Sequence, residues 1–465
     1  FPLLPPPLLT VRHVKTDTGW NPDINAVLHV KVIAGVFDAC DTIVTATDAS
    51  REGEMLFRYL YRFLGCRKPC LRLWISSLTD EAIAKGMENL RPCSLFDNLF
   101  LAADSRNKAD WLLGVNSSYA VCKAVCFGNN SLGRVQTPVL AAISGRYRER
   151  ENHIPADSWP VFVSLCKNGK IIKMRHVEDF CNRRDALELY EDCKAAGYAR
   201  ITAVNSRTEE ITAPALYNLT GLQKDANRYH NLTAIRVQEI TQSLYEKKLI
   251  SCPRTSSRLL PGDVYDMLPP VMEKLLSGKE FRQYAGMIDL AARKGVTGNQ
   301  DTAEHHAIVI TGIQPGELDR EERLVYTLVV GRMLETFMPP CKVEYTTVEA
   351  VCAARKFRIR TYRILEAGWL GIFQRERLVA EDNDLCPVPP ELFREEKLPV
   401  TGCSLIHWKS LPAAPYTDEE LADYMDKTGL GTASTRTNII RTLLQTKYIR
   451  YSGKYIIPTP KGLLL

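Results

Sequence analysis

Residues 41–65 form one continuous pattern of strand, turn and helix, which limits the class of fold that this chain can adopt. The run DTIVTAT (41–47) is short and rich in β-branched residues, as expected for a buried parallel strand. The turn DASREGE (48–54) follows, and MLFRYLYRFLG (55–65) continues as an amphipathic helix that ends at a glycine. CLRLWISS (70–77) then alternates like a second strand. We therefore predict an α/β domain in this part of the chain.

The rest of the 465-residue chain predicts further domains. Residues 95–150 have a helical pattern, residues 158–210 look like strands, and residues 216–250 return to helices. Strand-like sequence comes back at 342–376, and the C-terminal part is helical before a predicted hairpin, KYIRYSGKYIIP. Two strand-like regions that flank a helical block predict one β domain with a helical domain inserted into it.

The distribution of charge suggests a polyanionic partner. Sixty basic and 54 acidic residues give a net charge of +6. Residues 431–465 contain six Lys or Arg and no Asp or Glu, and residues 117–150 contain five basic residues and one Glu. Contacts to phosphate supply the salt-dependent part of nucleic-acid affinity, although a solvated basic face would give each stretch the same composition. No apolar run reaches the roughly 18 residues of a membrane span, so no membrane partner is expected.

The 14 cysteines are expected to be reduced thiols. No C-x-x-C pair occurs, and the C-x3-C pairs at Cys66/Cys70 and Cys122/Cys126 have no matching second pair, which disfavours a zinc site. The sequence shows no secretory signal, with its basic region before an apolar one. A cytoplasmic location, where thiols stay reduced, is therefore expected.

Three carboxylates, Asp48, Glu52 and Glu54, lie in the turn that follows the first predicted strand. Open α/β sheets place ligand sites at the carboxyl ends of their strands. Crowded carboxylates repel one another unless a cation or protons intervene, and hard oxygen ligands suit Mg²⁺. The turn therefore indicates a magnesium site, while a helix N-terminus that carries acidic residues is the simpler alternative.

Three further motifs carry side chains suited to phosphate. SLGRVQTP (131–138) and CPRTSSR (252–258) each combine an Arg with hydroxyl groups, a set that can cradle a phosphate or cap a helix. EHHAIVITG (304–312) brings two adjacent histidines, of which His305 or His306 could bind phosphate or relay a proton. Each motif alone is a weak signal.

Together these motifs resemble the type IA DNA topoisomerases, particularly the topoisomerase III branch. ATDASREGE is similar to the acidic motif of the TOPRIM domain, and SLGRVQTP, LYEKKLISCPRTSSRLLP, EHHAIVITG and GLGTASTRTNIIRTLL match the family's other signatures in order and rough spacing. The resemblance covers almost the whole chain. It implies a multidomain fold with α/β, α and β parts arranged as a torus, in which one helical domain can lift to open the ring. The implied domains are a TOPRIM α/β domain at residues 1–93, a helical DNA-binding domain at 94–156 and 399–465, a β arch domain at 157–211 and 342–398, and a helical domain with the active-site motif at 212–341.

The resemblance implies an isomerase that cuts one DNA strand through a tyrosine, passes another strand through the gap and reseals the break. The covalent phosphotyrosine conserves the energy of the broken bond, so ATP is not needed, and the chain has no G-x4-G-K-[S/T] loop. The implied cofactor is Mg²⁺, and the implied partner is DNA, especially its single-stranded regions. The implied location is the bacterial cytoplasm, where the protein would be associated with the nucleoid or a plasmid. No protein partner is implied, and relaxation and decatenation are both open as the main task.

Individual residues also acquire roles from the resemblance. Cys252 stands where the family has its nucleophilic tyrosine, Arg254 would hold the scissile phosphate and stabilise charge in the transition state, and His305 would lie near the scissile site. The expected metal ligands are Asp48 and Glu52. The expected DNA contacts are Arg106, Lys108, Arg134, Gln136, Thr255 and Ser256.

Three departures from the family pattern predict impaired activity. The Cys252 sulfur is about a ring's length closer to the backbone than a phenol oxygen, whereas attack needs reacting atoms within roughly 3–3.5 Å; Tyr265 does not fit the motif. Ser50 stands where the family usually has a second Asp, which predicts a weaker metal site. The family's first strand, with its Glu and Lys, is not found before Phe1, so an N-terminally incomplete TOPRIM domain is expected.

Two functions fit these features. The chain is a type IA topoisomerase with an impaired nucleophile, or it is a catalytically inactive clamp that binds single-stranded DNA. In the clamp, aromatic side chains such as Tyr448, Tyr451 and Tyr455 would interleave with basic grooves. A TOPRIM nuclease or primase is disfavoured because the motifs outside TOPRIM would then be unexplained.

Overall fold

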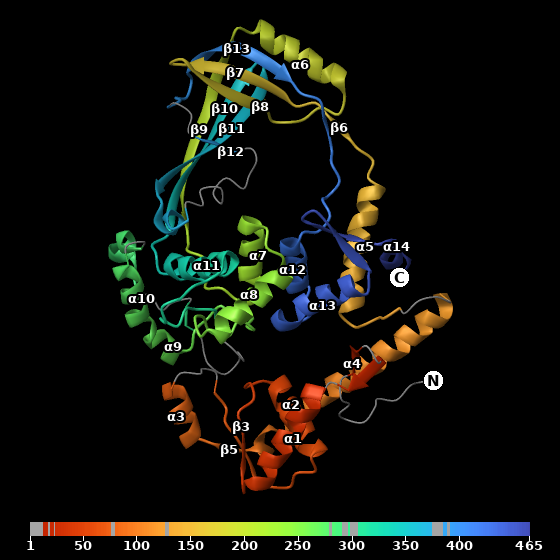
Figure 1. The fold of residues 1–465 in the computed structure, drawn as a ribbon. Coiled ribbons are helices and arrows are strands. Elements are labelled where there is room, and N and C mark those ends of the chain that lie inside the picture. The colour runs from red at the N-terminus through yellow and green to blue at the C-terminus, as the bar shows by residue number, and fades with distance from the viewer. Residues whose placement is uncertain are drawn as a thin grey trace.

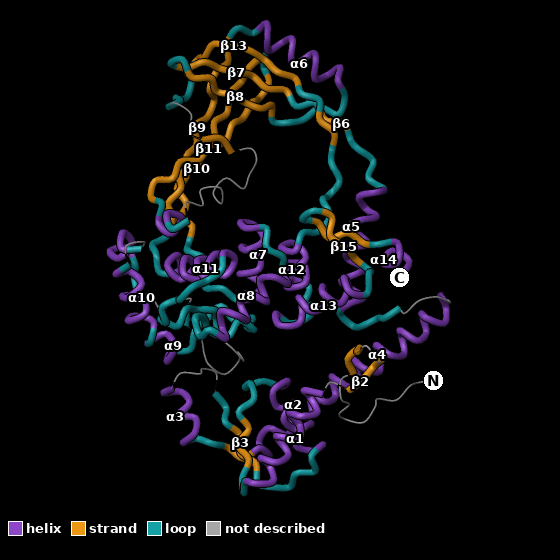
Figure 2. The backbone as a smooth tube through the Cα atoms, viewed as in Figure 1, coloured by secondary structure: helices purple, strands orange, loops and turns teal. Residues whose placement is uncertain are grey.

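Figure 1 presents a computed structural model of the chain, in which groups of helices and strands surround a central opening. The backbone tube in Figure 2 shows the same arrangement, with the strands gathered mainly at one end and the helices at the other. The structure describes residues 13–16, 19–22, 24–75, 80–125, 130–278, 281–290, 296–297, 306–373, 385–387 and 391–465.

The N-terminal group contains a small sheet with helices beside it. Strand β3 (Ile43–Thr45) pairs in parallel with β4 (Cys70–Arg72), and β4 pairs antiparallel with β5 (Arg91–Pro92). Helix α2 (Arg51–Phe63) connects β3 to β4 and is followed by Gly65, whose φ of 61° ends the helical run. The predicted strand, turn and helix are therefore confirmed. The group also contains α1 (Ile24–Ala39), α3 (Asp80–Glu88) and the 3₁₀ helix η1 (Cys93–Phe96), while β1 (His13–Thr16) and β2 (Gly19–Pro22) form a separate two-stranded sheet.

Two long helices lead from this group to the rest of the molecule. Helix α4 (Asp97–Val125) packs against α2 and then runs away from the N-terminal group (Figure 1). Helix α5 (Gln136–Glu151) runs toward the strands at the far end of the ring, and its residues Val139, Leu140 and Ile143 are buried. These two helices confirm the helical pattern of residues 95–150.

A seven-stranded sheet forms the arch at the far end of the ring (Figure 1). Its order is β10-β9-β13-β7-β8-β11-β12, and because β10 also pairs with β11, the sheet closes on itself. Strand β13 crosses the predicted domain boundary at residue 398 and pairs with β7 and β9. The strands are β7 (Val161–Lys167), β8 (Lys170–His176), β9 (Tyr198–Ile211), β10 (Cys341–Cys352), β11 (Arg355–Glu366), β12 (Leu385–Pro387) and β13 (Lys397–Leu405).

Helix α6 (Arg183–Ala195) lies on this sheet, inside a region whose sequence looked entirely strand-like. Its buried residues Ala186, Leu189 and Cys193 follow a spacing of three and four, and Asn182 caps its first turn. The expectation of strands throughout 158–210 was therefore wrong for this helix. The short strands β6 (Asp157–Ser158) and β14 (Trp408–Lys409) pair where the chain leaves and rejoins the arch.

The helical block lies between β9 and β10 in the sequence, as the flanking strand patterns predicted. Its core includes Val237, Ile240 and Leu244 of α8, all almost completely buried. The helices of the block are α7 (Leu219–His230), α8 (Ala234–Glu246), α9 (Gly262–Asp266), α10 (Leu268–Ser277) and α11 (Arg320–Thr336), with the 3₁₀ helices η2 (Arg282–Met287) and η3 (Gly368–Gly371) beside it.

The C-terminal group packs against α5 and contains the predicted hairpin. Tyr448 is fully buried there, and the Tyr451 hydroxyl donates to the Asp418 carboxylate at 3.0 Å. These two side chains belong to the fold and do not form an exposed stacking platform, which corrects their expected role in a clamp. The elements are α12 (Asp418–Lys427), α13 (Ala433–Gln445), β15 (Ile449–Ser452), β16 (Tyr455–Pro458) and α14 (Pro460–Leu464).

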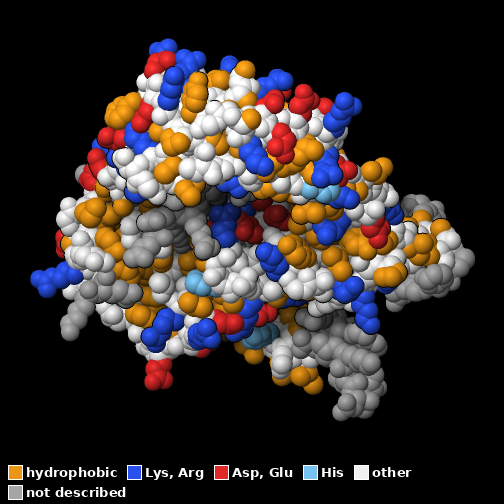
Figure 3. Space-filling model, turned by 90° about the horizontal axis from the view of Figure 1, so that it is seen from above, with side chains coloured by type: hydrophobic (Ala, Val, Ile, Leu, Met, Phe, Trp, Pro, Cys, Tyr) orange, Lys and Arg blue, Asp and Glu red, His pale blue; other side chains and the backbone are white. Residues whose placement is uncertain are grey.

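The helical block closes the ring by contacting α12 and α13 (Figure 1). Ion pairs cross this contact, with 2.6 Å between Arg228 and Glu419 and 3.0 Å between Arg441 and Glu239. Viewed from above, the molecule is hollowed at its centre, and Lys, Arg, Asp and Glu side chains are visible in the hollow (Figure 3).

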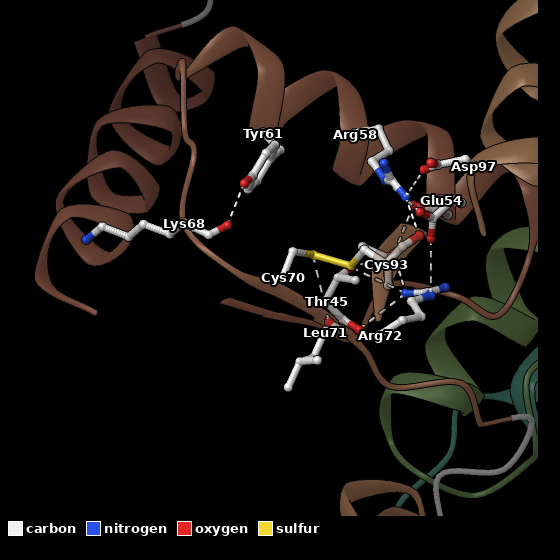
Figure 4. The surroundings of a disulfide bond; sticks show 12 residues. Thr45, Glu54, Arg58, Tyr61, Lys68, Cys70, Leu71, Arg72, Cys93 and Asp97 are labelled. Carbon is white, nitrogen blue, oxygen red and sulfur yellow. Dashed lines mark hydrogen bonds and ion pairs between the residues drawn. A yellow bond between two sulfur atoms is a disulfide. The ribbon is translucent and has the colours of Figure 1, made fainter. Parts of the chain in front are cut away.

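Cys70 and Cys93 form a disulfide that joins β4 to η1 (Figure 4). The expectation that all cysteines are reduced thiols is therefore wrong at this pair, because the fold brings together two cysteines that are 23 residues apart in the sequence. Among the described residues, no helix is long and apolar enough to span a membrane.

Candidate active site

The acidic turn, residues Asp48–Glu54, has a tightly fixed backbone at the end of β3. The Ser50 hydroxyl caps α2 by accepting a hydrogen bond from the Gly53 amide at 3.0 Å. A side chain at Gly53 would place its Cβ only 2.2 Å from the Asp48 carbonyl oxygen, so the turn requires glycine there. Asp48 and Glu52 are exposed. The turn thus presents two carboxylates to solvent and uses Ser50 to hold its shape.

Glu54 points toward Arg58 and Arg72 of the N-terminal group (Figure 4). Its side chain is fully buried and lies 2.8 Å from Arg58 Nε and 3.3 Å from the equally buried Arg72 Nε. Arg72 also donates to the carbonyl oxygen of Asp48 at 2.5 Å. Glu54 therefore neutralises arginines and does not join Asp48 and Glu52 as a third metal ligand, which corrects the grouping of these acids in the sequence.

The remaining donor set suits Mg²⁺ bound with few protein ligands. Asp48 and Glu52 supply hard carboxylate oxygens, and magnesium sites often combine one or two carboxylates with water and substrate phosphate. Within the described residues, no group of three or more His, Cys, Asp or Glu side chains is arranged to hold a metal. The residues fit a site that depends on a phosphate for its remaining ligands.

The Cys252 segment, residues 251–258, runs between α8 and α9 without regular secondary structure and is fixed mainly by backbone hydrogen bonds. The Ser251 amide donates to the Val309 carbonyl at 2.8 Å, and the Leu219 amide donates to the Thr255 carbonyl at 3.2 Å. The Asn218 side chain donates to the Ser256 carbonyl at 3.0 Å. These partners come from outside the segment and bind its backbone, so these hydrogen bonds do not involve the side chain at position 252.

Cys252 interacts electrostatically with Asp48 of the acidic turn. Burial raises the pKa of its thiol above the ordinary value, and the negative charge of Asp48 raises the pKa further. The backbone amide and the charge of Arg254 act in the opposite direction. Burial also raises the pKa of Tyr245, with smaller contributions from Cys252 and Asp48. The structure therefore brings the predicted nucleophile position, Arg254 and one predicted metal ligand into electrostatic contact.

The other residues of the segment differ in exposure, and therefore in whether they can contact a bound DNA strand. Arg254 is exposed, and its Nη2 makes a long hydrogen bond of 3.4 Å to Gln242. Ser256 is also exposed, whereas Thr255 is buried and its hydroxyl accepts from the Ser257 amide at 3.0 Å. Arg254 and Ser256 can therefore contact a bound strand, while the Thr255 side chain supports the segment from inside.

Arg106 and Arg134, two of the expected DNA contacts, share the carboxylate of Asp110. Arg134 binds it with two hydrogen bonds, of 2.5 Å and 3.1 Å, and Arg106 Nε lies 3.9 Å away. Arg106 also lies 3.5 Å from Glu52, one of the expected metal ligands. The hydrogen bond that Arg134 donates to Asp110 raises the pKa of Arg134. These four residues, Glu52, Arg106, Asp110 and Arg134, form a chain of alternating charges that we call the charge relay.

The remaining expected contacts are engaged within the protein. Gln136 is half-buried, and its amide nitrogen donates to the Ser131 carbonyl at 3.2 Å, so it shapes the loop that carries Arg134. Lys108 lies 2.8 Å from Asp104, a buried carboxylate that also accepts from the Tyr59 hydroxyl.

The histidine pair and Tyr265 are the remaining residues considered from the sequence. His305 lies outside the described residues, and its neighbour His306 has Nδ1 2.7 Å from the Ala307 carbonyl oxygen. Tyr265 is 3% exposed, and its hydroxyl donates to the Leu290 carbonyl, so it belongs to the core of the helical block. Tyr265 therefore cannot replace the missing tyrosine without unfolding its surroundings.

Sequence reasoning missed Asp110 and Tyr245. Asp110 lies four residues after Arg106 on a predicted helix, a spacing that signals a side-chain pair. Tyr245 lies on the last turn of α8, ahead of the Cys252 segment, and no motif rule singled it out.

Comparisons with known proteins show which family the chain is similar to. The profile of a family described as DNA topoisomerase matches residues 94–465. The chain is 30% identical to "DNA topoisomerase 3" of Bacillus licheniformis and of Bacillus subtilis (strain 168), over 99% of this chain and 66% of each relative. It is 32% identical to "DNA topoisomerase 3" of Bacillus anthracis, over 90% of this chain and 61% of the relative. The chain thus spans less than two thirds of the length of these relatives.

A solved structure also has the same fold. Full-length topoisomerase I from Thermotoga maritima superposes with a TM-score of 0.73 over 95% of this chain and 72% of that chain, at 19% sequence identity. At this identity the likeness concerns the arrangement of helices and sheets.

Proposed function

The chain belongs to the type IA DNA topoisomerases, in the topoisomerase III branch, and from this membership we propose that it binds single-stranded regions of underwound DNA between Asp48 and Cys252. The observation that carries this proposal is the electrostatic interaction of Asp48 in the acidic turn with Cys252, which lies within the family's active-site motif LYEKKLISCPRTSSRLLP. We also propose that the thiol leaves the chain unable to cleave DNA by the family's route, although the groups around it are retained.

Cleavage in this family requires a nucleophile that reaches phosphorus. The tyrosine oxygen forms a bond to phosphorus, the bond from phosphorus to a deoxyribose oxygen breaks, and that oxygen takes up a proton. Arg254 is exposed beside position 252 and would bind the scissile phosphate. Asp48 and Glu52 would hold Mg²⁺, which when bound supplies positive charge beside the phosphate. Arg134 and Arg106 would bind the flanking backbone.

The Cys252 thiol is poorly suited to this step. Its raised pKa keeps it protonated near neutral pH, and the thiolate is the reactive form. Its sulfur also ends about one aromatic ring short of a tyrosine oxygen, while productive attack needs about 3–3.5 Å between the reacting atoms. Arg254 and Ser256 nevertheless retain the exposure that a strand contact needs.

The experiment that tests this proposal is the single substitution Cys252→Tyr. Negatively supercoiled plasmid is incubated with Mg²⁺, and the products are separated with and without denaturant. We expect no relaxation by the Cys252 protein, and relaxation with a denaturant-resistant protein–DNA adduct for the Tyr variant. Tyr245→Phe in the Cys252→Tyr background is the matched control, since it removes the neighbouring phenol and should leave the adduct on residue 252.

Two results would contradict parts of this assignment. Relaxation by the Cys252 protein at the rate of the Tyr variant would show that the thiol is not a disabling replacement. Normal binding of single-stranded DNA by the Tyr variant without any adduct would favour the clamp, with Ser50 or another departure silencing the site.

A further inference from the structure

The charge relay connects the two functions that we propose for this site, phosphate binding and cation binding. Glu52 is at the start of α2, Arg106 and Asp110 are one turn apart on α4, and Arg134 precedes α5. Two acids alternate with two arginines, so the relay is neutral as it stands. Asp110 is the only one of the four that contacts both arginines.

The relay is accessible to a strand of DNA. The side chains of its four members are between 38% and 56% exposed, so none is locked in place by burial. Exposed ion pairs of this kind contribute little to stability. A phosphate can form the same bidentate contact with the Arg134 guanidinium that the Asp110 carboxylate forms now.

We propose that Asp110 is a positioning residue that occupies the phosphate site on Arg134 until DNA arrives, and that its displacement frees Glu52. This rests on the function proposed above. When a phosphate takes Arg134, the Asp110 carboxylate retains Arg106, which lies four residues earlier on the same helix. Arg106 then pairs with Asp110 and moves away from Glu52, which it contacts at 3.5 Å in the relay as it stands. Glu52 becomes available as an oxygen ligand for a divalent cation.

The exchange makes phosphate binding and cation binding favour each other. If a strand frees Glu52 for Mg²⁺, then Mg²⁺ on Glu52 must by linkage strengthen the binding of that strand by the same factor. The coupling requires the negative charge of Asp110, because without it Arg106 has no second partner in the relay and stays on Glu52.

The test is the affinity for a fluorescein-labelled single-stranded oligonucleotide, measured by anisotropy in EDTA and in Mg²⁺ at equal ionic strength. In EDTA, Asp110→Asn should bind the strand more tightly than the wild-type chain, on the order of two- to fivefold, because the competing carboxylate is gone. Added Mg²⁺ should then increase the affinity of the variant for the oligonucleotide less than it increases the affinity of the wild-type chain. A merely structural role for Asp110 would weaken binding in both conditions.

Two further variants sharpen the test. Asp97→Asn removes another exposed carboxylate of α4, which pairs with Arg58 at 2.8 Å outside the relay. This variant should leave unchanged both the affinity for the oligonucleotide and the effect of Mg²⁺ on that affinity. Asp110→Glu keeps the negative charge, so Mg²⁺ should still increase the affinity of this variant for the oligonucleotide.

The outcomes separate the two proposals. If the wild-type chain fails to bind single-stranded DNA, the proposed function fails first. If the wild-type chain binds and Asp110→Asn matches it in both conditions, or binds more weakly in both, then the exchange role of Asp110 is overturned while the proposed function stands.

Discussion

The acidic turn and the Cys252 segment, the two halves of the candidate site, are held in shape by different kinds of interaction. The acidic turn depends on side chains, because buried Glu54 neutralises Arg72, and Arg72 in turn binds the Asp48 carbonyl. The Cys252 segment depends on its backbone, which is bound from outside by residues such as Leu219 and Val309.

This difference explains where each half can change without losing its shape. The hydrogen bonds that hold the Cys252 segment from outside run to its backbone, so a thiol can replace a phenol at position 252 and leave those hydrogen bonds in place. In the acidic turn a change is tolerated where the new residue takes over a structural task. Ser50 does so by capping α2, and an Asp at that position could cap the helix equally well.

The largest effect is expected from Arg72→Met in the acidic turn. This change leaves the Glu54 carboxylate buried without one of its two arginines, and breaking a buried pair costs about 3–5 kcal/mol. Hydrogen exchange in β3 and β4, measured by mass spectrometry on the full chain, should become much faster. Exchange in the arch sheet should stay unchanged.

Two controls test whether the broken ion pair causes the faster hydrogen exchange. Arg67→Met removes an exposed arginine of the same group and should have no comparable effect. Arg72→Met combined with Glu54→Leu removes both buried charges and should recover part of the protection. Equal exchange in the single and double variants would mean that the ion pair is not what holds the turn.

Local sequence patterns predicted much of the fold but little of this side-chain pairing. The strand, turn and helix at residues 41–65, the inserted helical block and the C-terminal hairpin each have a periodicity that is readable from neighbouring residues. The partner of Glu54 is not readable in this way, because Arg72 reaches it only after β4 pairs with β3. Sequence proximity therefore grouped Glu54 with Asp48, whereas the fold separates them.

Side-chain pairing in the candidate site is equally hard to read from the sequence. The order of the family motifs predicts that Asp48 and Cys252 belong to one site, although they are distant in sequence. It did not anticipate that Arg106 and Arg134 share Asp110, because the choice of ion-pair partner depends on how α4 and the loop before α5 approach each other. Helix α6 was missed for a related reason, since strands on both sides dominate the pattern.

A smaller effect is expected from Thr255→Val in the Cys252 segment. Valine keeps the shape of the buried side chain and removes the hydroxyl that accepts from the Ser257 amide, which costs about 1–2 kcal/mol. Local hydrogen exchange at the Ser257 amide should rise, while Ser256→Ala, at an exposed position, should leave it unchanged. If Thr255→Val instead changed only the affinity for DNA, Thr255 would be a strand contact and not a support.

The smallest effect concerns the electrostatic contact between the two halves. The pKa of Cys252 is raised, so the folded state favours the neutral thiol, and this contribution to stability is lost as the pH rises through the folded pKa. Asp48→Asn removes a negative charge that opposes thiolate formation, so the pKa of Cys252 should fall. Alkylation by iodoacetamide at pH 8, followed on the Cys252 peptide, should then be faster, by no more than about tenfold.

Exposed Cys181 and a distant acid supply the references for this measurement. Cys181 should react faster than Cys252 in the wild-type chain and should not respond to Asp48→Asn. Glu188→Gln, on α6 of the arch, removes an exposed charge far from the site in sequence and should leave the Cys252 rate unchanged. An unchanged rate in Asp48→Asn as well would mean that the acidic turn and the Cys252 segment do not face each other closely enough to share a phosphate. In that case the two halves would keep their separate frameworks without forming one site.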